Sequence, residues 1–377
     1  MRKLFWLLLS MSIITILIFT GCGSQATTPL KTSPSASPVA TQTTAKPGTP
    51  ITIKLTFASE KGPTHTDMTK NFPGFFKMVE EAAGGKYAFD IQYYPVNTLL
   101  AGADIYDGIV KGVVDAGQSS TAYTPKRFPL LLTLSQPGIA PPKSASAAAN
   151  AVMQLYKKYN PKEFSDTHIL YFYPTGPGWM HAKSPITTVD QMKGKKIRVS
   201  GVGVEAIKLI GGDPVAMPMG DVYEAAQKGI IEILVSPAET LEGWKHAELF
   251  DYSTFVPYIY ASDIFFVTMN LNKWNSLPDD LKAAFESVSV QAAIRAGAMW
   301  DYIHEHAKEY AKSQPGGHQF LTLSDAEAAK LVEIIKPIRD QYLAFLKEQG
   351  LPGEEIISET QRIVNECNQQ QYAPWQP

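Results

Sequence analysis

The regular alternation of short apolar strands with short helices is the feature of this sequence that most constrains its fold. Residues 51–57 and 87–94 alternate apolar and polar side chains, as half-buried strands do. After a break at 174–178, the pattern predicts strands at 196–200, 215–217 and 230–236, with helices at 203–210 and 222–228. Strands that alternate with helices at this spacing predict an α/β fold with largely parallel sheets.

One short segment occurs twice in similar form. Lys111-Gly112-Val113-Val114-Asp115 is followed 117 residues later by a Lys-Gly-Ile-Ile-Glu segment at 228–232. We interpret each copy as a helix that ends at glycine and leads into a buried strand, which then reaches Ser119 or Ser236. Two such units predict two lobes built on one plan, although this pattern is also a common helix-to-strand joint. Because ligands bind beyond the carboxyl ends of strands in α/β sheets, the two serines would face each other across a cleft.

A long helix is predicted near the end of the chain. It starts in the segment 275–280, with a capping asparagine and two acids, and its apolar pattern runs to about Lys312. More than about thirty helical residues would measure roughly 45–50 Å, enough to span both lobes. The expected fold is therefore α/β, two-lobed and similar to periplasmic binding proteins, with a long lobe-spanning helix. We expect lobe 1 at 51–175 and 262–302, and lobe 2 at 176–261 and 303–377.

The N-terminus has the pattern of an exported lipoprotein. Arg2 and Lys3 precede a largely apolar run that ends at Gly21-Cys22, which predicts a signal peptide at 1–21 and lipid attachment at Cys22. An uncleaved membrane anchor is the alternative, but the run is short for a hydrocarbon core of about 30 Å. Residues 22–50 are rich in Pro, Ser and Thr. This composition predicts that the segment is a disordered tether, about 30 Å long on average.

Cysteine content and charge narrow the class further. Cys367 is the only cysteine besides Cys22, so lipidation of Cys22 would leave no internal disulfide. The formal net charge is −2, with no long basic run. We therefore expect no nucleic-acid partner.

Catalytic motifs are largely missing from the sequence. It contains no Gly-x-Ser-x-Gly elbow, no P-loop and no Cys-x-x-Cys. His304-Glu305-His306 is expected on a helix surface, because residues two apart on a helix do not face each other. Residues 201–206 fit a Gly-x-Gly-x-x-Ala dinucleotide pattern, but the predicted export argues against it. We predict no catalytic residue, no cofactor and no metal, and an exported enzyme is the weakest alternative.

Arg198 is the strongest candidate for ligand binding. It ends an apolar strand, and Gly201 and Gly203 open the next predicted helix. A guanidinium beside a helix N-terminus suits a carboxylate, since both supply N–H donors to the same anion. The alternative is an arginine paired with a structural acid.

Four segments resemble the solute-binding receptors of TRAP (tripartite ATP-independent periplasmic) transporters, of the dicarboxylate-receptor type. They are Thr-Val-Asp-Gln-Met-Lys-Gly-Lys-Lys-Ile-Arg-Val at 188–199, Gly-Gly-Asp-Pro-Val-Ala-Met-Pro at 211–218, Gln-Lys-Gly-Ile-Ile-Glu at 227–232 and Met-Asn-Leu-Asn-Lys-Trp-Asn-Ser-Leu-Pro at 269–278. The similarity covers about 51–341. It implies a membrane-anchored extracytoplasmic receptor that captures an organic acid and delivers it to membrane permease subunits. A receptor for an ATP-driven importer or a chemosensory system is the alternative.

The resemblance also assigns roles to single residues. Arg198 matches the arginine that clamps the ligand carboxylate, and Ser236 matches a frequent pocket asparagine. Trp179 lies where a second arginine is common, which favours a monocarboxylate stacked on an aromatic ring, although Trp179 could equally belong to the core between the lobes. Tyr123, Ser119 and Glu239 are weaker candidates. Metal-assisted receptors of the family have a carboxylate followed by an aromatic residue near Ser236, and this chain has no such pair.

Overall fold

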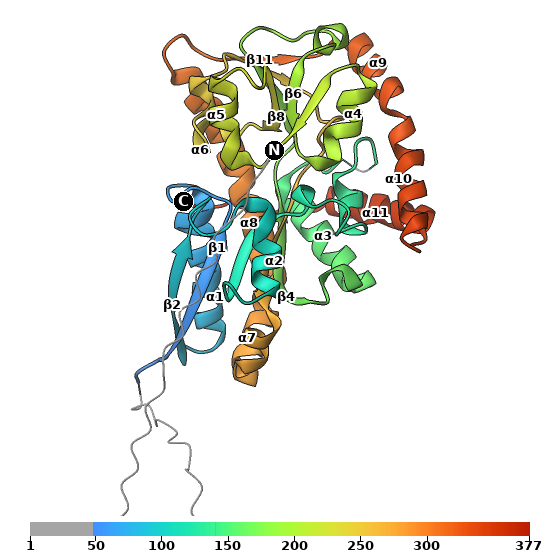
Figure 1. The fold of residues 1–377 in the computed structure, drawn as a ribbon. Coiled ribbons are helices and arrows are strands. Elements are labelled where there is room, and N and C mark those ends of the chain that lie inside the picture. Colours follow the sequence, from blue (N-terminus) through green and yellow to red (C-terminus); the bar gives the residue numbers. More distant parts are fainter. Residues whose placement is uncertain (1–47, 140) are drawn as a thin grey trace, which may run out of the picture. The chain divides into compact units, whose positions relative to one another are not determined.

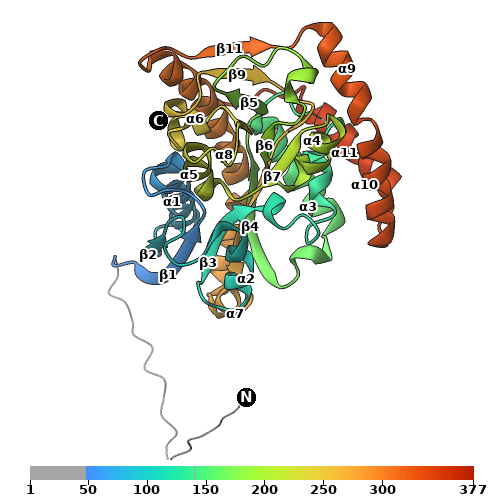
Figure 2. The same ribbon diagram turned by 45° about the horizontal axis from the view of Figure 1, so that its top comes forward.

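The computed structural model describes residues 48–139 and 141–377, and Figures 1 and 2 show its fold. The predicted signal peptide, Cys22 and nearly all of the predicted tether lie outside the described residues. In the described part, no helix is both long and apolar enough to cross a membrane.

Two separate mixed sheets organise the chain. The first has the order β2-β1-β3-β10-β4, and the second has the order β11-β9-β5-β8-β6-β7. The strands of the first sheet are β1 (Ile51–Ser59), β2 (Tyr87–Tyr94), β3 (Ala116–Ser120), β4 (Thr167–Pro174) and β10 (Ile264–Asn270). Those of the second are β5 (Gly178–Ala182), β6 (Lys196–Val199), β7 (Asp213–Ala216), β8 (Ile233–Pro237), β9 (Tyr252–Phe255) and β11 (Gln319–Thr322).

Each sheet combines parallel pairs toward one edge with antiparallel pairs beside them. β1 pairs in parallel with β2 and β3, and β6 pairs in parallel with β7 and β8. β10 is antiparallel to β3 and β4, and β5 is antiparallel to β8 and β9. The α/β class and the two-lobed architecture are therefore confirmed.

The helices cover the sheets and connect their strands. They are α1 (Phe72–Ala82), α2 (Ile105–Val110), α3 (Ala145–Tyr159), α4 (Val204–Leu209), α5 (Val222–Gln227), α6 (Thr240–Gly243), α7 (Leu271–Ser276), α8 (Asp279–Ser313), α9 (Asp325–Ile335), α10 (Pro337–Glu348) and α11 (Gly353–Cys367). α8 has 35 residues and contacts α1 and α3 beside the first sheet as well as α6 beside the second. The expected long lobe-spanning helix is confirmed.

The chain passes between the two sheets at three places. β4 of the first sheet leads into β5 of the second, β9 of the second leads into β10 of the first, and α8 then runs from the first lobe back to the second. In Figures 1 and 2, α8 lies between elements of the two sheets. No lobe is therefore a continuous segment of the sequence.

The repeated segment has the same local structure in both copies. α2 and β3 span 105–110 and 116–120, and α5 and β8 span 222–227 and 233–237, so every boundary is shifted by 117 residues. Gly112 and Gly229 both have a positive φ, 73° and 68°, which glycine adopts without steric cost. The prediction that a buried strand follows directly was wrong. Val113 and Ile230 lie in the connection, and each is about half exposed.

The C-terminal helices differ from the expected domain division. α9 contributes Leu331 and Ile335 to the core of the second lobe. In α11, by contrast, Ile356 and Ile363 bury their side chains in the core of the first lobe, where this helix packs on α3. We had expected residues 303–377 in lobe 2. α10 makes the crossing, because Ile338 lies in the core of the second lobe and Leu346 in that of the first. The other domain boundaries stay predictions.

Candidate functional site

A small cavity lies where the ends of strands from both sheets meet. It has a volume of about 20 Å³, room for roughly one water molecule. Its lining residues are Glu60, Lys61, Tyr123, Thr175, Arg198, Met219, Pro237, Glu239, Thr240, Trp244, Tyr260, Asp263, Phe265 and Trp300. Several of them directly follow the carboxyl ends of β1, β3, β4 and β8, where ligands bind in α/β sheets.

Arg198 enters the cavity from β6 with its side chain fixed by the backbone. The residue is only 2% exposed. Its Nε and Nη2 donate to the carbonyl oxygen of Met217 at 3.1 and 2.7 Å, and Nη1 donates to that of Val235 at 3.3 Å. In the part of the chain that the structure describes, no carboxylate forms an ion pair with it. Of the five N–H groups of a guanidinium, two are therefore left for another acceptor.

The glycines after Arg198 have a different role from the one expected. Gly201–Gly203 forms a 3₁₀ turn before the short helix α4, and neither glycine lines the cavity. A Cβ on Gly201 would lie 2.5 Å from the carbonyl oxygen of Ala122 in the other lobe. Close approach of the two lobes therefore explains glycine at this position.

Tyr123 lines the cavity and connects the lobes. Its hydroxyl accepts a hydrogen bond from the backbone N–H of Met219 at 3.0 Å. Burial, followed by the nearby Glu60, raises the pKa of Tyr123 well above its ordinary value. The phenol therefore stays protonated and can donate within the cavity.

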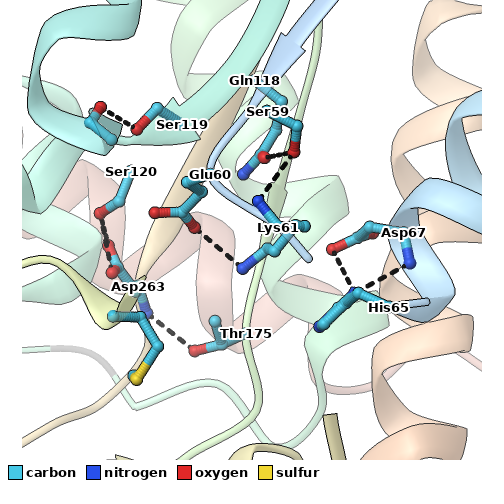
Figure 3. Close-up of polar contacts among 12 residues, drawn as sticks. Ser59, Glu60, Lys61, His65, Asp67, Gln118, Ser119, Ser120, Thr175 and Asp263 are labelled. Carbon is cyan, nitrogen blue, oxygen red and sulfur yellow. Dashed lines mark hydrogen bonds and ion pairs between the residues drawn. The ribbon is translucent and has the colours of Figure 1, made fainter. Parts of the chain in front are cut away.

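Glu60 and Lys61 form a buried ion pair that the sequence analysis missed. Lys61 Nζ lies 2.9 Å from Glu60 Oε1, and both side chains are 3% exposed. The ammonium also lies 3.9 Å from the ring centre of Phe265 and 5.2 Å from that of Trp300, within cation–π range. Figure 3 shows the pair beside Ser59 at the end of β1. Their position at a strand end was a signal that could have found them.

Glu239 joins the lobes from the opposite wall. It follows β8, and its Oε1 lies 2.8 Å from His65 Nε2 of the first lobe. The His65 Nδ1 accepts the backbone N–H of Asp67 at 3.0 Å, a contact that Figure 3 shows. The contact therefore ties the two lobes together on one side of the cavity.

Asp263 completes the polar lining and was also missed. Its carboxylate accepts the hydroxyl of Ser120 at 2.8 Å, and its backbone N–H donates to Thr175 Oγ1 at 3.0 Å. Burial raises the pKa of Asp263 to about 7, even though the Ser120 hydrogen bond lowers it. This carboxyl is consequently shared between its neutral and ionised forms near neutral pH.

The remaining predicted residues lie outside the cavity lining. Ser119 donates to the carbonyl oxygen of Gly102 at 2.6 Å, and Ser236 Oγ lies 2.7 Å from Thr240 Oγ1. Trp179 packs against Phe255 with ring centres 4.9 Å apart, which matches the alternative of a core position. Cys22 is not among the described residues.

His304 corrects the expectation of a surface His-Glu-His segment. It is buried and accepts a hydrogen bond from Trp179 Nε1 at 3.2 Å, and burial lowers its pKa to about 4. His306 instead contacts Glu242 at 2.7 Å on the exposed side. Within residues 48–139 and 141–377, no three His, Cys, Asp or Glu side chains are grouped to hold a metal ion.

Two sheets, a spanning helix and a polar cavity lined from both sides define a two-lobed binding protein. The family model of the bacterial extracellular solute-binding proteins, family 7 (DctP), matches residues 56–344. The chain belongs to this family of extracytoplasmic receptors.

Individual relatives agree with this assignment. A TRAP periplasmic solute-binding protein from Desulfovibrio salexigens is 29% identical, with a TM-score of 0.71 over 83% of this chain and 96% of that one. One from Rhodoferax ferrireducens, solved with copurified benzoate, is 23% identical, with a TM-score of 0.77 over 84% and 98%, and shows the fold.

A monocarboxylate 2-oxoacid-binding periplasmic protein from Nostoc is 25% identical over 61% of this chain. The chain spans 64% of the length of the first two curated relatives that it matches.

Proposed function

We propose that this protein is the extracytoplasmic receptor of a TRAP-type transporter, which captures an organic carboxylate and delivers it to membrane permease subunits. The observation that carries the proposal is the buried guanidinium of Arg198, which backbone carbonyls orient and which keeps two N–H groups free at the cavity. A buried charge without a partner is costly. An anionic ligand would offset that cost.

Capture would require the two lobes to separate and close again. The cavity of about 20 Å³ is far smaller than an organic acid. Its walls come from both lobes, and the contacts Tyr123–Met219 and His65–Glu239 already connect them. The acid would therefore enter an open form and be enclosed when these contacts form, which is a hinge closure of the kind that two-lobed receptors use.

The class of ligand follows from the cavity and from what relatives bind. Similar proteins are described with benzoate and with 2-oxoacid monocarboxylates. The cavity offers Arg198 as its unpaired cation, since Lys61 is paired with Glu60. We favour one carboxylate enclosed by aromatic rings, which Trp244 and Trp300 supply in place of the predicted Trp179.

Truncation of Arg198 tests the proposal directly. A thermal-shift screen over mono- and dicarboxylates identifies the ligand that stabilises the full-length chain, because ligands raise the stability of the state that they bind. Arg198→Ala should then weaken that ligand by roughly 2–5 kcal/mol, on the order of 30-fold to several thousand-fold in Kd. Arg339→Ala is the matched control, since Arg339 pairs with Glu354 on the surface. Equal affinity in the Arg198→Ala variant would overturn the assignment.

Two finer points belong to the same proposal. Lipidation of Cys22 would hold the receptor at the outer face of a membrane, and Cys22→Ser should release it from the membrane fraction. A receptor without enzymatic activity should return its ligand unchanged, so mass spectrometry of the acid recovered after incubation would reveal any turnover.

A further inference from the structure

Buried acids outnumber buried cations around the cavity. Glu60, Glu239 and Asp263 line it together with only two cations, Lys61 and Arg198, and each of the five residues is 5% exposed or less. Water therefore screens these charges little, and their balance matters for what the site can accept.

His65 does not supply a third positive charge. Its Nδ1 accepts a hydrogen bond from the N–H of Asp67 at 3.0 Å, so that nitrogen carries no proton. In the neutral ring the proton is then on Nε2, which lies 2.8 Å from Glu239 Oε1. In this tautomer His65 adds no positive charge that would compensate the carboxylate of Glu239.

Glu239 also has an oxygen without a partner. Its Oε2 is buried and, within the described residues, receives no hydrogen bond, whereas Oε1 contacts His65. Both oxygens of Glu60 also lack a hydrogen-bond partner within the described residues, but the ammonium of Lys61 lies 2.9 Å away and compensates the charge of that carboxylate. Leaving a buried carboxylate oxygen unsatisfied costs free energy. Glu239 Oε2 is therefore the acceptor that most needs a donor from elsewhere.

The aromatic wall near Glu239 is suited to a positive charge. Trp244 lines the cavity with Glu239 and follows it closely in the sequence. The ammonium of Lys61 lies over the rings of Phe265, Trp300 and Trp244, at 3.9, 5.2 and 5.9 Å from their centres. Aromatic faces attract cations electrostatically, and this wall already holds one ammonium group.

A simple count of charges shows the consequence. With Asp263 neutral, Glu60 and Glu239 cancel Lys61 and Arg198, and a ligand with one carboxylate and no positive group would leave one negative charge in excess. With Asp263 ionised, the excess would be two. A ligand with one carboxylate and one cationic nitrogen would add no net charge.

We infer that the ligand is a zwitterion, with its carboxylate on Arg198 and a positively charged nitrogen on Glu239 Oε2 beside Trp244. This inference rests on the proposed function and adds a second recognition point to it. The chemical class comprises amino acids in which the carboxylate and a protonated amine are separated.

Pairs of acids that differ by one charge at constant shape test the inference. Suitable pairs are δ-aminovalerate with hexanoate, and meta-aminomethylbenzoate with meta-ethylbenzoate. Thermal shift and calorimetry on the full-length chain would give the affinity of each compound. In the pair that binds most tightly, we expect the zwitterion to bind about tenfold or more tightly than its partner, as a buried ionic contact allows.

Glu239→Gln then tests the assigned residue. Glutamine keeps an oxygen for the N–H of His65 but removes the charge, so folding should be preserved. The preference for the zwitterion should fall to about threefold or less, while Glu242→Gln, at a more exposed acid on α6, should leave it unchanged.

The outcomes separate this inference from the proposed function. If the partners without a cationic nitrogen bind as tightly as the zwitterions and Arg198→Ala abolishes binding of both, the proposed function stands and the zwitterion is refuted. A preference that survives in Glu239→Gln refutes the role of Glu239. If no zwitterion stabilises the protein while a carboxylate from the wider screen does, this inference is refuted and the proposed function stands.

Discussion

Replacing His246 with methionine should make the stability of this protein less sensitive to acid. His246 is fully buried, and within the described residues neither ring nitrogen has a hydrogen-bond partner. Burial, followed by the positive charge of Arg198, lowers its pKa from 6.5 to about 3. The folded protein therefore keeps this imidazole neutral at a pH where the unfolded chain protonates it.

The size of the effect follows from the two pKa values. Above pH 6.5 His246 is neutral in both states, and its titration does not change the free energy of unfolding. Below pH 6.5 the unfolded state binds a proton at His246 that the folded state does not bind. A solution at about pH 5 lies 1.5 pH units below 6.5, the pKa of His246 in the unfolded chain. Each pH unit in this range changes the free energy of unfolding by about 1.36 kcal/mol. The folded state should therefore lose about 2 kcal/mol between about pH 8 and pH 5 through this residue alone.

Urea unfolding of the wild type and of His246→Met at the two pH values measures this. The difference in unfolding free energy between the two proteins should shift by about 2 kcal/mol in favour of the variant on acidification. Comparing two proteins cancels the contributions of other groups, such as Glu163, whose pKa burial raises to about 7. His306→Met, at an exposed histidine, should show no such shift. A parallel pH dependence in the wild type and His246→Met would refute the reasoning.

Two glycines give further predictions. Gly201→Ala would place a Cβ 2.5 Å from the Ala122 carbonyl oxygen of the other lobe, so ligand affinity should fall by about 10-fold or more at an overpacking cost of about 1–3 kcal/mol. The control Gly62→Ala, with nothing within 4 Å of its Cβ, should bind the ligand normally. Equal affinity of Gly201→Ala and the wild type in calorimetry would contradict the close approach of the lobes. Gly297→Ala would place a Cβ 2.6 Å from the Ala145 carbonyl oxygen, where α8 packs on α3. This variant should instead lower the melting temperature of the ligand-free protein. An unchanged melting temperature in calorimetric scans would argue against that packing.

The fold was largely predictable because local patterns determine it. The alternation of strands and helices, the start of α8 and the repeat were all visible in the sequence, and the structure reproduces the repeat with a constant shift of 117 residues. The error at Val113 and Ile230 has a local cause. A glycine with positive φ turns the chain before each strand begins, and the apolar pattern alone does not show that turn.

The cavity was less predictable because it joins residues far apart in sequence. Arg198 could be proposed from its position at a strand end. Asp263 meets Ser120 across 143 residues, and Glu239 meets His65 across the two lobes, so neither contact leaves a local pattern. Trp179 shows the opposite problem, since an aromatic residue in the expected stretch turned out to pack in the core.

The three crossings of the chain between the sheets limit how the receptor can move. Two extended connections and the stiff helix α8 make these crossings, and α10 joins the lobes a fourth time. Together these links resist twisting and sliding but still permit rotation about a single axis. The angle between the two lobes would then describe essentially the whole motion. A single pair of fluorescent labels, one on each half, should therefore follow the whole conformational cycle.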